Sequence, residues 1–505
     1  MDTDTDTDTD AGAYDIAVVG CGPVGLSLAR LLAMKGLRVA AIDPNRLVCP
    51  HPRATHLDDE TMRLLQTLGA QDMEHRFLRQ AAWTLHRPDG QPFLRQTLPE
   101  EESDQGWRTD YQFHQPDFES RLRGLLAADA NVDLWFGWTA TAIEQDDQGV
   151  RLTLLDRASG TETSLTAGWA VGSDGAHSFV RRVMNAGTED LHGTQRSLII
   201  DVHPFDHPAQ LPADSGFIWC EGKRPVTYLP IFPPMLRFEF MLLGGDDAAR
   251  LERPQSVYDL LSRWLEPGSY RIMRTDTYEW HARLTHGWRS GRLLLAGDAA
   301  HEMPPMLGQG MCSGLRDAAN LAWKLAAVVK GDSPEALLDT YESERAAHVR
   351  PYIEESARQS NLIEALGTGA FPELNGTRTI ERFRPPLGPG VVPRPGGAVG
   401  RLSPQPRGAN GEKLDDVSGY GYTVVGKPEV TSAVSADVRQ LWRRLGVVTV
   451  PETGPAVDSW LAGHAAAAAI VRPDRYAFAL AADPAELERA TRDLARTVST
   501  QEVGA

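Results

Sequence analysis

The chain has 505 residues, of which 42% are hydrophobic and 24% charged, so we expect a globular protein of two or three domains. Its formal net charge of −17 argues against nucleic acid or an anionic membrane as a partner, and no apolar run is long enough to span a bilayer. The four cysteines are scattered without any C-x-x-C pattern, which predicts reduced thiols, no metal site and a cytoplasmic location.

The first elements follow an acidic segment. Residues 1–13 repeat Asp and Thr, which predicts a disordered tail with no role in the fold. After it, the pattern predicts an apolar strand at 14–20, a helix at about 23–35 and a second apolar strand at 37–42. This order is that of a βαβ unit.

The turn between this first strand and helix carries a G-x-G-x-x-G pattern. It contains Gly20, Gly22 and Gly25, with Pro23 opening the helix. These glycines allow a tight turn, close approach of a pyrophosphate to the backbone, and close packing of helix on strand. Asp43 ends the second strand, where a carboxylate can accept hydrogen bonds from an adenosine ribose. The unit predicts a dinucleotide site, although Asp43 could also be an ordinary strand-end residue.

The rest of the chain alternates helices and strands. Helices are expected at 58–68, 118–126, 311–329 and 335–366, and strands at 132–142, 150–155, 197–202, 216–220, 226–231, 236–243 and 293–296. A Pro/Gly/Arg-rich stretch at 371–412 is expected to be an ordered linker. Beyond it, strands and helices alternate at 420–425, 434–445, 468–471, 476–480 and 484–498.

These elements predict an α/β protein with three parts. Residues 14–194 and 286–370 would form a Rossmann-like nucleotide-binding domain. Residues 195–285 would form a mostly antiparallel β-sheet inserted between its two halves and binding the substrate. Residues 413–505 would form a small α/β domain of their own.

A second candidate site is Asp174-Gly175 with Arg181. An Asp-Gly pair alone is a common turn. Here it follows an apolar strand, and Arg181 comes one turn into the next helix. A carboxylate beside a helix N-terminus with an arginine nearby suits a diphosphate environment.

A third site lies at residues 297–311. Gly297, Asp298, Ala299, Ala300 and His301 follow a short buried strand, and a loop with Pro304, Gly308 and Gly310 leads into a helix at Met311. Asp298 could accept hydrogen bonds from ribityl hydroxyls, and the helix N-terminus could stabilise negative charge on a reduced flavin. The alternative is a capping aspartate in an ordinary loop. With the dinucleotide pattern, this site predicts FAD. Because only one G-x-G-x-x-G is present, NADH or NADPH would bind transiently.

In this order and spacing, the three motifs resemble the class A flavoprotein aromatic hydroxylases, the single-component FAD monooxygenases. The resemblance covers the chain apart from the acidic segment. It implies that the first motif holds the ADP half of FAD, the second lies near the diphosphate and nicotinamide route, and the third binds the ribityl chain beside the isoalloxazine. It also implies flavin contacts for Arg53 and Gln115.

Within that family the chain is most similar to the 3-(3-hydroxyphenyl)propionate and 3-hydroxycinnamate hydroxylases, on residues 224–228, 237–243 and 308–325. Residues 471–476 resemble the end of the family's thioredoxin-like C-terminal domain. Because C-x-x-C is missing, that domain is expected to serve packing or dimerisation, so a homodimer is one expectation for the assembly.

The resemblance implies an oxidoreductase that hydroxylates a phenolic acid next to its hydroxyl group, using O2 and NAD(P)H, in aromatic catabolism. A hydroxylase that tailors an aromatic polyketide is one alternative. A flavin reductase or dehydrogenase without oxygen transfer, and a flavin-binding protein without catalysis, are others. A halogenase is disfavoured because W-x-W-x-I-P is missing.

A base that helps to deprotonate the phenol would suit this chemistry. His301, Tyr228 and His203 are candidates by residue type, and His301 is preferred because it borders the flavin loop. A structural role for His301 is the alternative. Arg53 could also guide the nicotinamide.

Overall fold

The computed structural model describes residues 11–222, 224–367, 376–380, 382–407, 411–450 and 454–500. Of the expected tail, residues 1–10 lie outside this range, and residues 11–13 belong instead to the first strand, β1 (Ala11–Val19). Among the described residues, no helix combines the length and apolar character needed to cross a membrane.

The first sheet carries the three motifs. Its strand order is β17-β18-β11-β1-β2-β8, and all of these strands except β17 run parallel. The other bounds are β2 (Val39–Asp43), β8 (Val132–Phe136), β11 (Glu162–Gly172), β17 (Arg289–Ser290) and β18 (Leu293–Leu295). Residues 16–18 are fully buried, as expected for a parallel strand covered on both faces. β9 (Trp138–Gln145) and β10 (Val150–Asp156) extend β11 in antiparallel fashion, and the strand expected at 132–142 is divided between β8 and β9.

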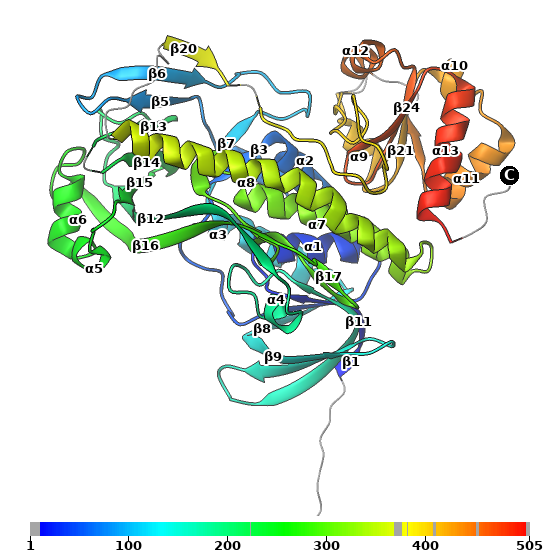
Figure 1. Ribbon diagram of the computed structural model, residues 1–505, viewed down its shortest axis with the longest axis horizontal. Coiled ribbons are helices and arrows are strands. Elements are labelled where there is room, and N and C mark those ends of the chain that lie inside the picture. The colour runs from blue at the N-terminus through cyan, green and yellow to red at the C-terminus, as the bar shows by residue number, and fades with distance from the viewer. Residues whose placement is uncertain are drawn as a thin grey trace, which may run out of the picture.

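Long helices cover this sheet. α1 (Pro23–Met34) packs against α3 (Gln115–Ala127) and α7 (Gly310–Val329). α7 and α8 (Asp339–Gly367) lie across the middle of the molecule in Figure 1. The shorter elements are η1 (Gln71–Arg76), η2 (Gly297–Ala299), η3 (Pro305–Leu307), η4 (Glu335–Leu338), α2 (Asp59–Leu68), α4 (Phe179–Val183), β3 (His56–Asp58), β4 (Leu78–Arg79) and β7 (Asp110–Gln112).

The second sheet is mostly antiparallel and larger than expected. Its order is β19-β16-β12-β15-β14-β13-β5-β6-β20. The bounds are β5 (Ala82–His86), β6 (Pro92–Thr97), β12 (Thr188–Pro204), β13 (Ser215–Trp219), β14 (Val226–Phe232), β15 (Met235–Leu242), β16 (Tyr270–Thr285), β19 (His301–Glu302) and β20 (Gly376–Thr379). Residues 82–97 and 376–379 fall outside the expected range of 195–285. They belong to this sheet because β5 pairs in parallel with β13, and β20 pairs in parallel with β6. Such pairing between distant segments leaves no signal in the local sequence.

One face of this second sheet is closed by two short helices, α5 (Ala248–Leu251) and α6 (Pro254–Leu261). The apolar side chains of β12, β14 and β15 that point to them form a separate core, which includes Leu198, Ile200, Phe238 and Phe240. Because side chains alternate along a strand, the intervening residues face the other way, toward the first sheet's motifs.

The C-terminal region forms a four-stranded sheet in the order β22-β21-β23-β24. β21 and β22 are parallel, and β21–β23 and β23–β24 are antiparallel. Its elements are α9 (Leu414–Ser418), β21 (Thr423–Gly426), α10 (Pro428–Thr431), α11 (Ala436–Arg444), β22 (Val448–Val450), α12 (Pro455–Gly463), β23 (Ala468–Val471), β24 (Ala477–Ala481) and α13 (Pro484–Val498).

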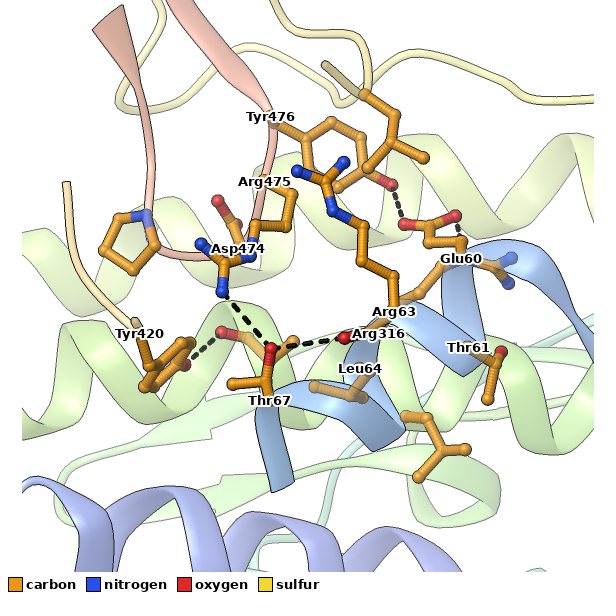
Figure 2. Close-up of a pocket in the computed structure, with 14 residues that line it drawn as sticks. Glu60, Thr61, Arg63, Leu64, Thr67, Arg316, Tyr420, Asp474, Arg475 and Tyr476 are labelled. Atoms are coloured by element: carbon orange, nitrogen blue, oxygen red, sulfur yellow. Dashed lines mark hydrogen bonds and ion pairs between the residues drawn. The ribbon is translucent and has the colours of Figure 1, made fainter. Parts of the chain in front are cut away.

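This region docks on α2, α7 and α8 through buried ion pairs. Arg63 of α2 donates to both carboxylate oxygens of Asp415 at 2.6 and 2.9 Å. Arg472 does the same to Glu344 of α8 at 2.8 and 2.7 Å. A small cavity remains at this junction, and Figure 2 shows it lined by side chains of α2, α7 and residues 473–476. These ion pairs join the C-terminal region to the rest of the chain.

Candidate functional site

The three motifs meet at one edge of the first sheet, because β1, β2, β11 and β18 run parallel and all end there. The Gly20 amide donates to Ile42 O at 2.8 Å, and the Ser173 amide donates to Val19 O at 2.8 Å. The Ala296 amide donates to Gly172 O at 2.9 Å. The carboxyl ends of parallel strands are where α/β sheets bind ligands.

The first motif depends on its missing side chains. A Cβ on Gly25 would lie 1.9 Å from Gly20 O, and Gly20 has a φ of +95° with Asp174 Cα 2.6 Å from where its Cβ would be. By contrast, a Cβ on Gly22 would meet no atom within 4 Å, so this side of the loop is open. Asp43 stands beside the loop, where its carboxylate accepts from the Cys21 amide at 2.8 Å.

In the second motif, the Asp174 side chain caps the N-terminus of α4. Asp174 accepts hydrogen bonds from the Ser178 hydroxyl and from the amides of Phe179 (2.6 Å) and Val180 (3.1 Å), so its carboxylate already serves the start of α4. Gly175 has a φ of +79° and open space where a side chain would be.

Arg181 links the second and third motifs instead of lying free for a diphosphate. Its guanidinium donates to Ala299 O at 3.1 Å, to Asp298 O at 3.3 Å and to Ala176 O. These contacts hold the two turns together. The sequence indicated a charge at this place but not its carbonyl partners.

The third motif packs directly on the first. Gly297 has a φ of +64°, and a Cβ there would lie 3.0 Å from Val24 Cγ2. Its amide donates to Asp317 of α7 at 3.1 Å. Asp298 is exposed. The surrounding protein nevertheless raises the pKa of its carboxyl through partial desolvation, and Asp317 adds to this rise. Asp298 is therefore open to solvent on one side and close to other protein groups on the other.

His301 is buried beneath this turn and corrects an expectation. Its side chain has 0% exposure, and its Nε2 lies 2.6 Å from Asp317 Oδ2. Arg345 of α8 donates to the other Asp317 oxygen at 2.8 Å. The pairing of β19 with β16 turns the imidazole inward. His301 thus cannot contact a substrate as its base, and it supports the loop.

The loop into α7 is closely packed on its inner side. Pro304 O accepts from the Ser356 hydroxyl at 2.6 Å, and a Cβ on Gly308, whose φ is +63°, would lie 2.7 Å from the His56 ring. Burial alone would lower the pKa of His56, but its bond to Asp110 raises it to about 10. α7 begins at Gly310, next to Met311, without a side-chain cap. Its N-terminus is therefore available to negative charge.

The Arg53 loop, residues 52–54, is held by hydrogen bonds with α3 and with β15. Gln115 accepts from the amides of Arg53 (3.0 Å) and Ala54 (2.8 Å), and its own amide donates to Glu119 at 2.6 Å. Arg237 of β15 donates to Pro52 O at 2.5 Å and to Arg53 O at 3.2 Å. Gln115 is thus committed to the chain itself, and the Arg53 side chain is exposed.

Near Asp298 lies an exposed side chain that the sequence did not indicate. Tyr278 of β16 is 43% exposed. Its pKa is raised to about 12 by burial of the phenol, with Asp298 and Glu302 adding to the rise and Arg53 opposing it. Asp298, Glu302 and Arg53 thus lie close enough to Tyr278 to act on it electrostatically, across the boundary between the two sheets. Only the pairing of β16 with β12 and β19 could have placed Tyr278 there.

Two further base candidates lie elsewhere. Tyr228 is fully buried in the core under α5 and α6, where its hydroxyl donates to Pro212 O at 2.9 Å. It therefore faces away from the motifs. His203 is half-buried near the end of β12.

The edge of the first sheet suits a dinucleotide with a planar, partly anionic end. The open sides of Gly22 and Gly175 admit close approach to the backbone, and Asp43 lies at the strand end where a ribose would bind. Asp298 follows β18 at the same edge, and the loop after it leads to the uncapped start of α7. None of the residues predicted for the site lines the cavity of Figure 2.

Comparison with known proteins agrees with this geometry. The family model described as an FAD binding domain matches residues 13–356. A probable NADH-specific resorcinol 4-hydroxylase of Rhodococcus jostii (strain RHA1) is 32% identical over 96% of both chains. A 3-(3-hydroxy-phenyl)propionate/3-hydroxycinnamic acid hydroxylase of Comamonas testosteroni is 30% identical, covering 96% of this chain and 97% of its own.

Solved structures share the fold. Aklavinone-11 hydroxylase, in a ternary complex with FAD and aklavinone, aligns with a TM-score of 0.79 and 23% identity over 96% of this chain and 99% of its own. The flavin-dependent monooxygenase PieE, in complex with FAD and substrate, aligns with a TM-score of 0.78 and 19% identity over 97% and 99%.

Proposed function

This chain belongs to the FAD-dependent aromatic hydroxylases, and from that premise we propose that it hydroxylates a meta-substituted phenol beside its hydroxyl group. It is a flavoprotein monooxygenase that uses FAD and a nicotinamide electron donor. The substrate we propose first is 3-(3-hydroxyphenyl)propionate, with 3-hydroxycinnamate, giving the 2,3-dihydroxy product in aromatic catabolism. The name of the Comamonas relative supports this choice.

The observation that carries the proposal is that the edge of the first sheet with the three motifs lies next to the second sheet. The exposed side chains of Arg53, Asp298 and Tyr278 lie at that boundary. A flavin ring placed there would have the ADP-binding turn on one side and the sheet on the other. A phenol could then lie between ring and sheet.

The chain's own residues have separate tasks in this proposal. Gly20, Gly22, Gly25 and Asp43 bind the ADP half, Asp298 binds the ribityl hydroxyls, and Arg53 lies beside the ring. When bound, FAD takes electrons from the nicotinamide and supplies the oxygen chemistry. The protein orients the substrate and excludes water, and the uncapped start of α7 favours negative charge on the reduced cofactor.

The experiment measures NADH consumption by the FAD-loaded protein with a panel of phenols. The mass of each product is determined by mass spectrometry. Gain of one oxygen on 3-(3-hydroxyphenyl)propionate supports the proposal. Loss of NADH that yields only hydrogen peroxide across the panel contradicts it and favours a flavin reductase. Reactions without a phenol measure the background.

A second substrate is favoured by the Rhodococcus relative, whose name specifies resorcinol and NADH. Hydroxylation of resorcinol in place of the phenolic acid would shift the proposal to that substrate. Rates with NADH and NADPH compared in the same assay would identify the donor.

We also propose that residues 413–505 form a thioredoxin-like domain for packing or dimerisation. The order and directions of β21 to β24 support this. All four cysteines are free, and none of them lies in residues 413–505. Light scattering of the holoprotein measures the assembly, and a monomer would contradict the dimerisation role.

A further inference from the structure

Glu239 occupies the face of the second sheet that points toward the Arg53 loop. On β15, Phe238 and Phe240 point into the core under α5 and α6, so Arg237 and Glu239 point the other way. Arg237 reaches the carbonyls of Pro52 and Arg53, which fixes the direction of this face. Glu239 therefore faces the boundary where the flavin ring and phenol are proposed to lie.

The Glu239 carboxylate lacks a hydrogen-bond donor although little of it is exposed. Its side chain is 14% exposed, and its nearest cation, Arg237 Nη1, is 3.8 Å away, beyond hydrogen-bond reach. Arg237 is already committed to Asp201, at 2.7 and 2.9 Å. Among the described residues no other group donates to Glu239. A carboxylate at such depth is costly without a partner.

The neighbours of Glu239 across the sheet make no hydrogen bond to its carboxylate in the part of the chain that the structure describes. Glu239 pairs with Thr227 of β14 and Ile199 of β12, and Ile199 is 8% exposed. Burial raises the pKa of Glu239, Asp201 adds to this, and Arg237 opposes it. The site thus combines the apolar side chain of Ile199 with a carboxylate that accepts no hydrogen bond from the described residues.

We propose that Glu239 accepts a hydrogen bond from the phenolic hydroxyl of the substrate and thereby sets which ring edge faces FAD. This rests on the proposed function and deepens it. A phenol O–H supplies the missing donor, and its ring can lie over Ile199. Hydrogen bonding to a carboxylate also increases electron density at the neighbouring ring carbons, where oxygen would enter. The expected ligand is a phenol, or a benzene-1,3-diol, with a free hydroxyl group.

The test is equilibrium binding to the FAD-loaded protein without NADH, followed by flavin absorbance. The probes are resorcinol and 1,3-dimethoxybenzene, which has no hydroxyl proton. Glu239→Gln keeps size and shape, and it is expected to weaken resorcinol binding about tenfold or more with FAD content unchanged. Its binding of 1,3-dimethoxybenzene should match that of the wild type. Glu279→Gln, at an exposed glutamate of β16, is the matched control and should bind both probes as the wild type does.

A pH series separates this role from a structural one. The charged groups that act on Glu239 are Arg237 on its own strand, Asp201 on β12 and Arg274 on β16. Because the acceptor must be ionised, wild-type affinity for resorcinol should fall as pH drops through the raised pKa of Glu239, and the Glu239→Gln profile should be flat there.

The outcomes distinguish this inference from the proposed function. Equal resorcinol affinity and equal pH profiles for Glu239→Gln and the wild type overturn the role of Glu239 even if phenols are hydroxylated. Resorcinol binding that depends on Glu239, without any hydroxylated product, supports that role and contradicts the proposed function. A wild-type protein that binds neither resorcinol nor 3-(3-hydroxyphenyl)propionate overturns the role of Glu239.

Discussion

Replacing Arg237 with methionine tests how the second sheet controls the flavin-side loop. Arg237 is 1% exposed and Asp201 is fully buried, so Arg237→Met leaves a carboxylate in the core without its cation. Removing one partner of such a pair costs about 3–5 kcal/mol of unfolding free energy. Arg53 O also loses the donation from Arg237, at about 1 kcal/mol. Pro52 O loses one of two donors, since Arg274 still donates to it at 3.1 Å.

The assay is urea denaturation of the FAD-loaded protein, followed by tryptophan and flavin fluorescence. Arg237→Met should unfold at a clearly lower urea concentration than the wild type. The double variant Arg237→Met/Asp201→Leu should recover most of the stability, because an apolar pair can replace a buried ion pair. It should still show slow flavin reduction by NADH, since the Arg53 loop lacks its two bonds. An unchanged midpoint for the single variant would refute this reasoning.

Three further predictions concern the motifs. Gly25→Ala should yield protein without FAD, measured by flavin absorbance, because the added Cβ would lie 1.9 Å from Gly20 O; normal flavin content would contradict it. Burial alone would raise the pKa of Asp317, but His301 and Arg345 hold it below its usual range. Asp317 should therefore stabilise the fold above about pH 4 and lose this effect as pH falls through its lowered pKa. The difference in stability between the wild type and Asp317→Asn should shrink accordingly in acid, and a constant difference would argue against the ion network. Arg53→Ala should keep FAD but slow its reduction by NADH in stopped flow, and an unchanged rate would remove Arg53 from the nicotinamide route.

Much of the cofactor site was predictable because its signals are local. The tight turn at Gly20, the glycines facing open space and the long helix after Gly310 each depend on a few consecutive residues. The parallel order of β1, β2, β11 and β18 then brings the motifs to one edge.

The partners of other site residues could not be predicted, because they depend on what a side chain meets across the fold. His301 borders the flavin loop in sequence, yet strand pairing turns it into a buried contact with Asp317. The cofactor contacts expected for Arg181 and Gln115 stay predictions, and the sequence did not indicate the hydrogen bonds that both residues make within the chain. A single sequence carries no signal for such partners.

The sequence by itself determined the cofactor class, since the glycine turns and strand–turn–helix order are set by backbone conformation over short stretches. Only the tertiary structure decided which side chains of the second sheet face that cofactor. Arg237, Glu239 and Tyr278 reach the boundary through the register of β12, β15 and β16, and a slip of one residue would turn each of them to the opposite face. That register joins residues far apart in the chain, so the phenol side of the site becomes visible only when the sheet is assembled.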